Sequence, residues 1–331
     1  TLAVTGFIEV LQQFKSIAYA LNLVKKTLVT QRPDLLVLID YPGFNLKVAK
    51  FAKSLNIKIL YLNPPQVWAW NAKRIEAIRE YVDHTLLLLP FEQDFYQKHK
   101  VKATLIPHPL LNRCHPITNT KKKELKKIWD LNPEYPVVGL LPGSRRHEVQ
   151  QLLPIQLRIA RLTHKEHPNT QWVLPLANSL SYTEIEHYLL QFPELNIRCI
   201  QEDHLTAMHL CDLAIATSGT VTLEAALLEI PTIIMNRINW LSFLLAKSLV
   251  KIKYIGLCNI IANQGILPEY LQHQVIPEKI SNQLNQWLTN PSETEALKKQ
   301  LKIVRQTFKK ANISPLTEYL TSILLQKKHS K

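Results

Sequence analysis

The feature that most constrains the fold is an alternation of short apolar runs with segments of helical periodicity. In the first third of the chain, apolar runs at residues 35–39, 57–61 and 85–89 are separated by helix-like segments near 46–55 and 72–81. Parallel strands need a crossover connection, which a helix usually supplies, so this alternation is typical of a parallel sheet. The sequence therefore predicts an α/β fold.

The alternation is interrupted once and then starts again. Residues 107–123 contain three prolines and three consecutive lysines, a composition typical of a linker. After this segment, an apolar run at 136–142 leads into a helix-like segment at 147–166, and further strands are expected at 171–174, 197–199 and 213–216. A length of 331 residues also fits two domains better than one.

We therefore predict two Rossmann-like domains with parallel sheets that face a cleft, because ligands of such sheets bind at the carboxyl ends of the strands. The expected bounds are 1–115 for the first domain, 116–300 for the second and 301–331 for C-terminal basic helices. The tail from residue 292 reads as two amphipathic helices, separated by Ser314 and Pro315. Its basic residues form either a solvated face or a surface that packs onto the first domain.

Basic residues outnumber acidic ones, 40 Lys and Arg against 26 Asp and Glu, which gives a formal net charge of +14. Such a charge favours an anionic partner: nucleic acid, a phosphorylated substrate or an anionic membrane surface. The four cysteines are widely spaced, which supports neither a zinc site nor a disulfide framework and fits a reducing compartment. Because no membrane span or signal peptide is visible, we expect a soluble or peripheral protein.

Gly143, Ser144 and Arg145 lie between an expected strand and an expected helix, in a chain with only seven glycines. A glycine turn, free backbone N–H groups at a helix start and a guanidinium together suit a phosphate or diphosphate. The alternative is a tight turn with a solvent-exposed arginine. The segment matches neither a Walker loop nor a dinucleotide fingerprint.

A second loop of this kind contains Ser218, Gly219 and Thr220, again between a strand and a helix. Its backbone and hydroxyl groups offer donors to a phosphate. Glu224 follows about one turn into the helix, where its carboxylate is placed either to accept hydrogen bonds from ribose hydroxyls or to act as a capping residue. Two such loops in one domain predict a nucleotide diphosphate site.

The first domain offers two acids for catalysis. Asp40 ends an apolar strand and is a candidate general base, with capping of the next helix as the alternative. Glu9 follows Gly6 in what reads as another turn-like start, a weaker signal.

Aromatic residues form a third group of candidates. Trp68 and Trp70 follow a strand and either line a sugar or acyl pocket or pack in the core. Trp240 and Phe243 belong to a segment at 239–261 that combines apolar and lysine residues. That composition fits an interfacial helix at anionic lipid, or an ordinary helix docked on the sheet.

Several segments together resemble the lipid-A-disaccharide synthase family, bacterial glycosyltransferases of the GT-B fold. In chain order they are GFIEVL at 6–11, IDYPGFNL at 39–46, VWAW at 67–70, LPFE at 89–92, LLPGSR at 140–145, SGTVTLEAAL at 218–227, CNI at 258–260 and LPEYLQ at 267–272. Their order and spacing extend over nearly the whole chain.

The resemblance implies transfer of 2,3-diacylglucosamine from UDP to 2,3-diacylglucosamine 1-phosphate, with inversion and without a metal or cofactor. No Asp-x-Asp pair of the kind that grips a metal diphosphate occurs. Arg145 and the 218–220 turn would hold the diphosphate, Glu224 the ribose, and Asn259 would add a polar contact. The family further implies a cytoplasmic enzyme, peripheral on the inner membrane of a Gram-negative cell, with an anionic membrane surface and no nucleic acid as partner. A homo-oligomer is left open.

Two departures from the family pattern stand out. Many relatives have an aspartate where this chain has Gly43, which leaves Asp40 as the candidate base. Relatives also begin with a strand and a Gly-Glu-x-Ser-Gly-Asp loop before the segment that matches Gly6, so an N-terminal segment of about 60 residues, one to two βαβ units, is expected to be missing here. Two alternatives therefore stay open: another GT-B transferase that uses a UDP-sugar, and a truncated UDP-binding module without turnover.

Overall fold

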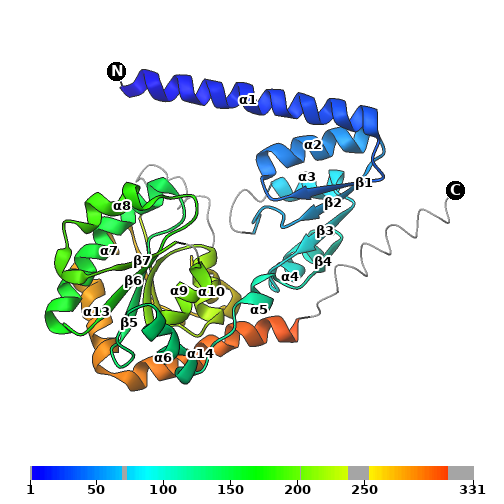
Figure 1. Cartoon of the computed structure of the whole chain (residues 1–331). Helices are drawn as coiled ribbons and strands as arrows, with labels where there is room; N and C mark the ends of the chain where they lie inside the picture. The colour runs from blue at the N-terminus through cyan, green and yellow to red at the C-terminus, as the bar shows by residue number, and fades with distance from the viewer. Residues whose placement is uncertain (1, 69–72, 202, 238–252, 312–331) are drawn as a thin grey trace. The chain divides into compact units, whose positions relative to one another are not determined.

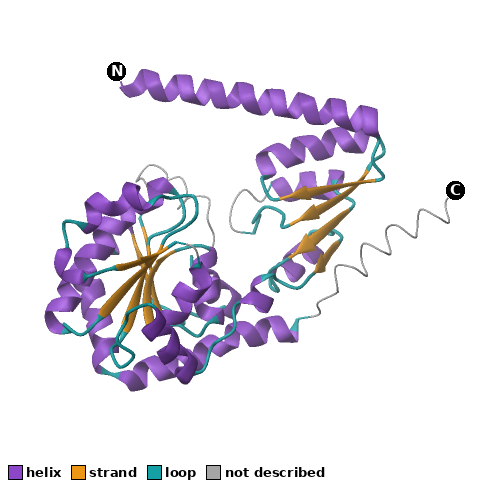
Figure 2. Ribbon diagram, in the orientation of Figure 1, coloured by secondary structure: helices purple, strands orange, loops and turns teal. Residues whose placement is uncertain are grey.

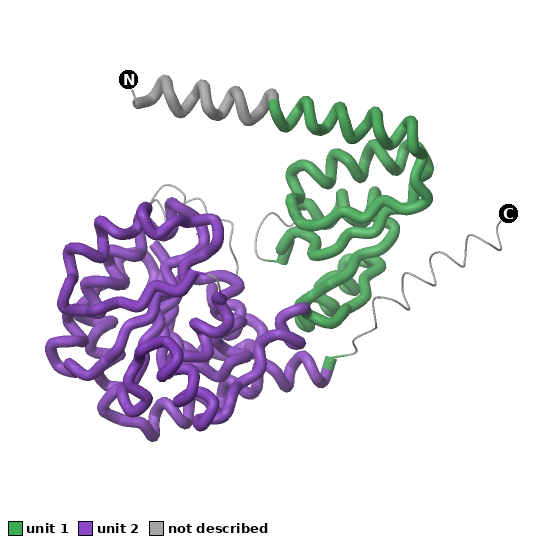
Figure 3. Tube along the Cα trace, in the orientation of Figure 1, with its two compact units in different colours: residues 1–108, 249–251, 311–331 green, residues 109–248, 252–310 purple. Residues whose placement is uncertain are grey.

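The computed structural model describes residues 2–68, 73–201, 203–237 and 253–311, with side chains from residue 16 onward. The chain divides into two compact units after His108 (Figure 3). The expected division after residue 115 lies seven residues later, because helix α5 (Leu110–Arg113) groups with the second unit, where it contacts α10 (Thr220–Leu227). Residues 301–310 also belong to the second unit, as the end of a long helix.

The first unit is built on a four-stranded parallel sheet in the order β1-β2-β3-β4 (Figure 1). Because the strands are parallel, their carboxyl ends meet at one edge. The three strands predicted for this unit are present, and their bounds differ from the predicted ones by at most two residues. The strands span Leu35–Ile39, Lys58–Leu62, His84–Leu87 and Ala103–Leu105, and helices α1 to α4 span Leu2–Gln31, Pro42–Ser54, Arg74–Tyr81 and Glu92–Lys98.

The turn-like start predicted around Gly6 and Glu9 is wrong, because both residues lie within the continuous helix α1. Further along α1, Leu21, Val24 and Leu28 recur at helical spacing and pack against the core of this unit. One glycine within a helix costs only about 1 kcal/mol relative to alanine, too little to interrupt a pattern of this length.

The second unit is built on a six-stranded parallel sheet in the order β10-β9-β8-β5-β6-β7, with helices on both faces (Figure 2). Strands β5 to β10 span Val137–Leu141, Gln171–Pro175, Arg198–Ile200, Leu213–Thr217, Thr232–Asn236 and Glu269–Leu271. The remaining helices are α6 (Asn119–Ile128), α7 (Arg146–Glu166), α8 (Tyr182–Leu189), α9 (His204–Leu210), α12 (Leu257–Ala262), α13 (Pro277–Thr289) and α14 (Pro291–Lys310), with 3₁₀ turns at Pro193–Leu195 and Gln272–Gln274.

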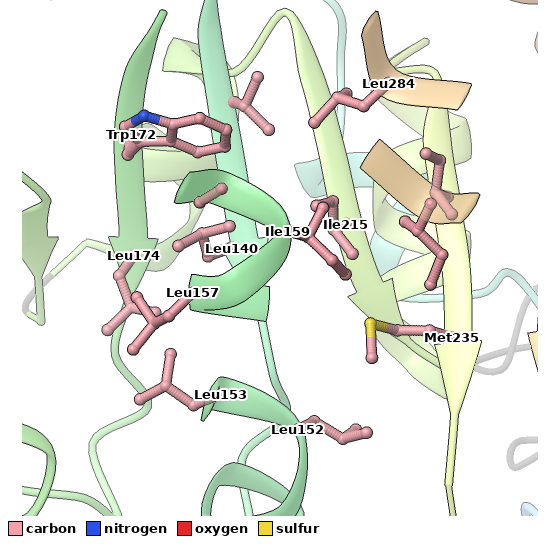
Figure 4. Packing of buried hydrophobic residues seen from close by; sticks show 14 of the residues in the cluster. Leu140, Leu152, Leu153, Leu157, Ile159, Trp172, Leu174, Ile215, Met235 and Leu284 are labelled. Carbon is pink, nitrogen blue, oxygen red and sulfur yellow. The ribbon is translucent and has the colours of Figure 1, made fainter. Parts of the chain in front are cut away.

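The main core of the second unit lies between the sheet and helices α7 and α13. Leu157 and Ile159 of α7 face Trp172 and Ile215 of the strands, and Leu284 of α13 completes the layer (Figure 4). Every residue of β5 and of β8 is buried, as expected for central strands covered on both faces. A smaller cluster, formed with α9, covers the opposite face.

The segment predicted as a linker contains two helices, α5 and α6. Its lysines are part of α6. Thr118 caps the N-terminus of this helix, and its side chain accepts a hydrogen bond from the Lys121 N–H at 3.3 Å. Lys122 and Lys126 of α6 reach the carboxylate of Asp212 at 3.0 and 2.8 Å. The lysine-rich stretch is therefore bound to the second unit by ion pairs.

Asp212 accepts a further hydrogen bond from the Val137 N–H at 2.9 Å, so it ties α6 to the starts of β5 and β8. Burial alone would raise the pKa of Asp212, but the charges of Lys122 and Lys126, with the hydrogen bonds from Lys126 and Val137, lower it below its usual value. The side chain of Lys126 is almost fully buried and depends on this counter-charge.

We expect Asp212→Ala to lower the free energy of unfolding of the second unit by about 3 kcal/mol at pH 7, because it leaves Lys126 buried without its partner. A lowered folded-state pKa means that the carboxylate stabilises the fold fully above the unfolded value of about 4 and loses this effect as the pH falls through the folded value. Urea unfolding measures this at pH 7 and below pH 4. The difference in free energy of unfolding between the parent and Asp212→Ala should be smaller at the lower pH.

The matched control is Asp130→Asn, because Asp130 also pairs with a basic residue, Arg198 at 3.3 Å, but its side chain is 81% exposed, and asparagine tolerates the φ of +53° at this position. We expect no measurable change there, since exposed pairs contribute little. Equal effects of the two substitutions, or an Asp212→Ala effect that is the same at both pH values, would show that the buried ion pair does not stabilise the fold in this way.

Candidate functional site

The second unit has a cavity of about 450 Å³ at the carboxyl edge of its sheet. It lies where β5, β6 and β8 end, the edge at which parallel α/β sheets bind ligands. The lining contains seven of the eight residues predicted to bind the nucleotide sugar. The lining residues are Leu141, Gly143, Ser144, Arg145, Glu148, Pro175, Leu176, Ala177, Asn178, His204, Thr217, Ser218, Gly219, Thr220, Val221 and Glu224.

The loop after β5 is closed by Glu148 of α7. Its carboxylate accepts a hydrogen bond from the Arg145 N–H at 3.3 Å, and its other oxygen accepts one from the Arg145 guanidinium at 3.1 Å. Gly143 has a φ of +120°, and a Cβ added there would lie 2.4 Å from a Glu148 carboxylate oxygen. Glycine is therefore required both by the backbone and by the space.

Arg145 is the N-terminal capping residue of α7, and its side chain is 72% exposed. An exposed guanidinium at the start of a 21-residue helix is placed to meet an anion together with the first N–H groups. Ser144 is exposed, and its carbonyl accepts a hydrogen bond from the Ser179 hydroxyl at 2.8 Å, which ties this loop to the one after β6.

The loop after β8 leads into α10 through Gly219, whose φ of +152° again favours glycine. Ser218 contacts the side-chain amide of Asn236 at the end of β9, and Thr220 begins the helix at the surface. Residues at this helix start and at the start of α7 line the same cavity. The two loops thus offer donors from two sides.

Glu224 is held by His204, a residue that the sequence patterns did not indicate. The Glu224 carboxylate lies 3.1 Å from His204 Nε2, and the Glu224 side chain is only 20% exposed. Glu224 does not cap α10, so the capping alternative is not what the structure shows. The sequence signal for His204 is its place directly after Asp203, the N-terminal capping residue of α9. The Asp203 side chain accepts a hydrogen bond from the Thr206 N–H at 2.9 Å.

Asn259 is not part of the cavity, which corrects its assignment as a substrate contact. It is fully buried, and its amide donates to the Leu267 carbonyl and to Glu269, both at 2.8 Å. Its oxygen accepts from the Ile266 and Leu267 N–H groups at 3.0 Å. Every hydrogen-bonding group of the side chain is thus used within the protein, where it closes the turn after α12.

In the first unit, Asp40 directly follows β1 and is exposed. Its side chain does not cap α2, because Tyr41 occupies the capping position without a side-chain bond.

The indole N–H of Trp68 donates to Glu92 at 2.9 Å, and the Trp68 ring meets the Phe91 ring edge to face. Burial raises the pKa of Glu92 to about 7, although the hydrogen bonds from Trp68, Leu89 and Leu88 lower it.

The other predicted residues cannot be placed. Trp70, Trp240, Phe243 and the side chain of Glu9 lie outside the described residues. Within the described ranges, no group of three or more His, Cys, Asp or Glu residues is arranged to hold a metal ion.

Sequence comparison gives a clear family. The family described as Lipid-A-disaccharide synthetase matches residues 1–322. A lipid-A-disaccharide synthase of Coxiella burnetii (strain Dugway 5J108-111) is 38% identical over 311 residues, which is 94% of this chain and 81% of the relative. A protein of the same name from Trichlorobacter lovleyi is 40% identical over 305 residues, 92% of this chain and 79% of the relative.

Solved structures share the fold at low identity. A UDP-GlcNAc 2-epimerase from Neisseria meningitidis bound to UDP-GlcNAc gives a TM-score of 0.60 at 13% identity, covering 94% of this chain and 81% of that one. A glycosyltransferase from Rickettsia africae gives 0.53 at 12% identity, covering 95% and 80%. The predicted α/β fold class of the GT-B type is confirmed.

We expect Asn259→Ala to lower the free energy of unfolding by about 2–3 kcal/mol, because it leaves buried backbone groups of Ile266 and Leu267 without partners. Urea unfolding measures the effect, with Asn178→Ala as the control, since Asn178 is exposed in the cavity lining. An unchanged free energy of unfolding in Asn259→Ala would show that the hydrogen bonds of Asn259 do not stabilise the fold.

Proposed function

The chain belongs to the lipid-A-disaccharide synthase family, and from this premise we propose that it transfers 2,3-diacylglucosamine from UDP to the 6-hydroxyl of 2,3-diacylglucosamine 1-phosphate. Family membership makes it a glycosyltransferase of lipid A biosynthesis. The proposal adds the two substrates, inversion at the anomeric carbon, and a mechanism in which no metal ion takes part. The products are a β-1,6-linked disaccharide and UDP.

The observation that carries the proposal is the convergence of two glycine-containing loops and an exposed arginine on one cavity. The Arg145 guanidinium and the backbone of the 143–144 and 218–220 loops are suited to a diphosphate, because both helix starts and guanidinium groups favour such an anion. Glu224 is suited to accept hydrogen bonds from ribose hydroxyls, since His204 occupies only one of its oxygens.

The proposed chemistry is a single displacement. A general base takes the proton of the acceptor hydroxyl while its oxygen forms a bond to the anomeric carbon, and the bond from that carbon to the UDP oxygen breaks. Arg145 and the loop donors stabilise the negative charge that develops on departing UDP. Asp40 is the proposed general base, because it is an exposed carboxylate at a strand end. The carboxylate of Glu9 is the alternative candidate for this role.

The substrates are acylated, so we propose that the protein works at the cytoplasmic surface of the inner membrane. A net charge of +14 supports attraction to anionic lipid. Trp68, Trp70, Trp240 and Phe243 are proposed contacts for the acceptor and its acyl chains. In the described part of the chain, no helix has the length and apolar character needed to cross a membrane.

We expect Arg145→Ala to weaken UDP binding about 10- to 100-fold, because a hydrogen bond to a charged group contributes roughly 1.5–3 kcal/mol. Isothermal calorimetry with UDP measures this, and UMP, which lacks the second phosphate, should show a smaller loss.

Arg146→Ala is the matched control. Arg146 is the next residue, is equally exposed at 72% and also pairs with a glutamate, Glu184 at 2.7 Å, but it does not line the cavity. Equal weakening by both substitutions would mean that general positive charge, and not the loop, binds UDP.

We expect Asp40→Asn to reduce turnover by about 10²- to 10⁴-fold, the usual contribution of a general base, while UDP affinity stays unchanged. The assay follows disaccharide and UDP formation from the two acylated substrates. Full turnover in Asp40→Asn with loss in Glu9→Gln would transfer the role to Glu9. Equal use of unacylated UDP-N-acetylglucosamine would favour another UDP-sugar transferase, and UDP binding without turnover in the parent would favour a binding module.

A further inference from the structure

The turn that carries Asp40 has an unusual backbone. Asp40 and Tyr41 have φ values of +48° and +42°, and among the described residues they are the only adjacent non-glycine pair with positive φ. This left-handed region is unfavourable for L-residues, and aspartate tolerates it better than tyrosine does. Such a turn persists only where neighbouring groups hold it.

Asn45, in the first turn of α2, supplies three of the contacts that hold the turn. Its side-chain amide donates to the Ile39 carbonyl at 2.9 Å and to the Asp40 carbonyl at 2.7 Å. Its own N–H donates to the Tyr41 carbonyl at 3.0 Å. Asn45 therefore contacts three consecutive carbonyl groups, those of the residue before Asp40, of Asp40 itself and of the residue after it.

Tyr61 of β2 adds a third donor from the core. Its hydroxyl donates to the same Asp40 carbonyl at 2.8 Å, and the side chain is fully buried. Burial and the nearby Asp40 charge raise the pKa of Tyr61, so its hydroxyl keeps its proton at neutral pH and remains a donor. The Asp40 N–H donates to the Leu62 carbonyl at 3.2 Å, which fixes the other end of the residue.

We propose that Asn45, supported by Tyr61, is a positioning residue that sets the direction of the Asp40 carboxylate. These contacts fix the Asp40 backbone at its N–H and at its carbonyl, so they fix the direction in which its Cβ leaves the chain. The inference rests on the proposed role of Asp40 as general base. Loss of Asn45 would therefore lower the turnover number with little change in UDP affinity.

We expect Asn45→Ala to reduce kcat about 10- to 100-fold, because displacement of a catalytic group by about 1 Å has an effect of this size. UDP affinity, measured by calorimetry, should stay within twofold, and the KM for the acceptor should change less than kcat. Tyr61→Phe keeps the buried ring and removes only one donor, so we expect a smaller loss, and it provides a second reading if Asn45→Ala does not fold.

Asn56→Ala is the matched control. Asn56 lies in the turn that follows α2 of the same unit, in the left-handed region with a φ of +59°, and the residues that hold the Asp40 turn do not include it. Asn45 itself lies within α2, so Asn56→Ala is matched in residue type and unit, and it reports what destabilisation of this unit alone does to kcat. A kcat loss in Asn45→Ala no larger than that in Asn56→Ala would overturn the proposal.

A double-substitution cycle separates the inference from the proposed function. If Asn45 acts through Asp40, adding Asn45→Ala to Asp40→Asn should lower kcat no further. If the two losses multiply, Asn45 acts independently and the positioning role is wrong, while Asp40 keeps its role as base. Full turnover in Asp40→Asn alone would overturn both.

Discussion

The pairing of β5 with β8 at the centre of the second sheet is the constraint on which the candidate site depends. The two strands are parallel neighbours, with Leu141 opposite Ala216, so the loops that follow them must emerge side by side at one edge. Both strands are fully buried, as central strands of a parallel sheet covered on both faces are. The starts of α7 and α10 then face one cavity, and an anion there meets both loops at once.

Much of this could be read from the sequence because the signals are local. An apolar run, a glycine and a helical pattern follow one another at 137–166 and again at 213–227, and each fixes a strand end next to a helix start. The positive φ values of Gly143 and Gly219 give the physical reason for glycine at both turns. The parallel sheet then brings the two loops together without any further signal.

The remaining features depend on hydrogen bonds that form only once the elements have packed, which no local sequence pattern reports. Asn259 looked like a ligand contact, yet its partners at 266–269 enclose it completely. His204 reaches Glu224 only through the packing of α9 near α10. The Asp40 turn is similar, because part of its support comes from Tyr61 on the neighbouring strand. At Gly6 the local signal is misleading, because a single glycine does not interrupt a helical pattern of this length.

A crystal structure of the protein soaked with UDP would locate the diphosphate relative to the two loops. We expect the second phosphate within hydrogen-bond distance of the Arg145 side chain and of N–H groups in the 218–220 turn, with a ribose hydroxyl on Glu224. UDP bound elsewhere on the protein, or in the cavity with its phosphates turned away from both loops, would contradict it.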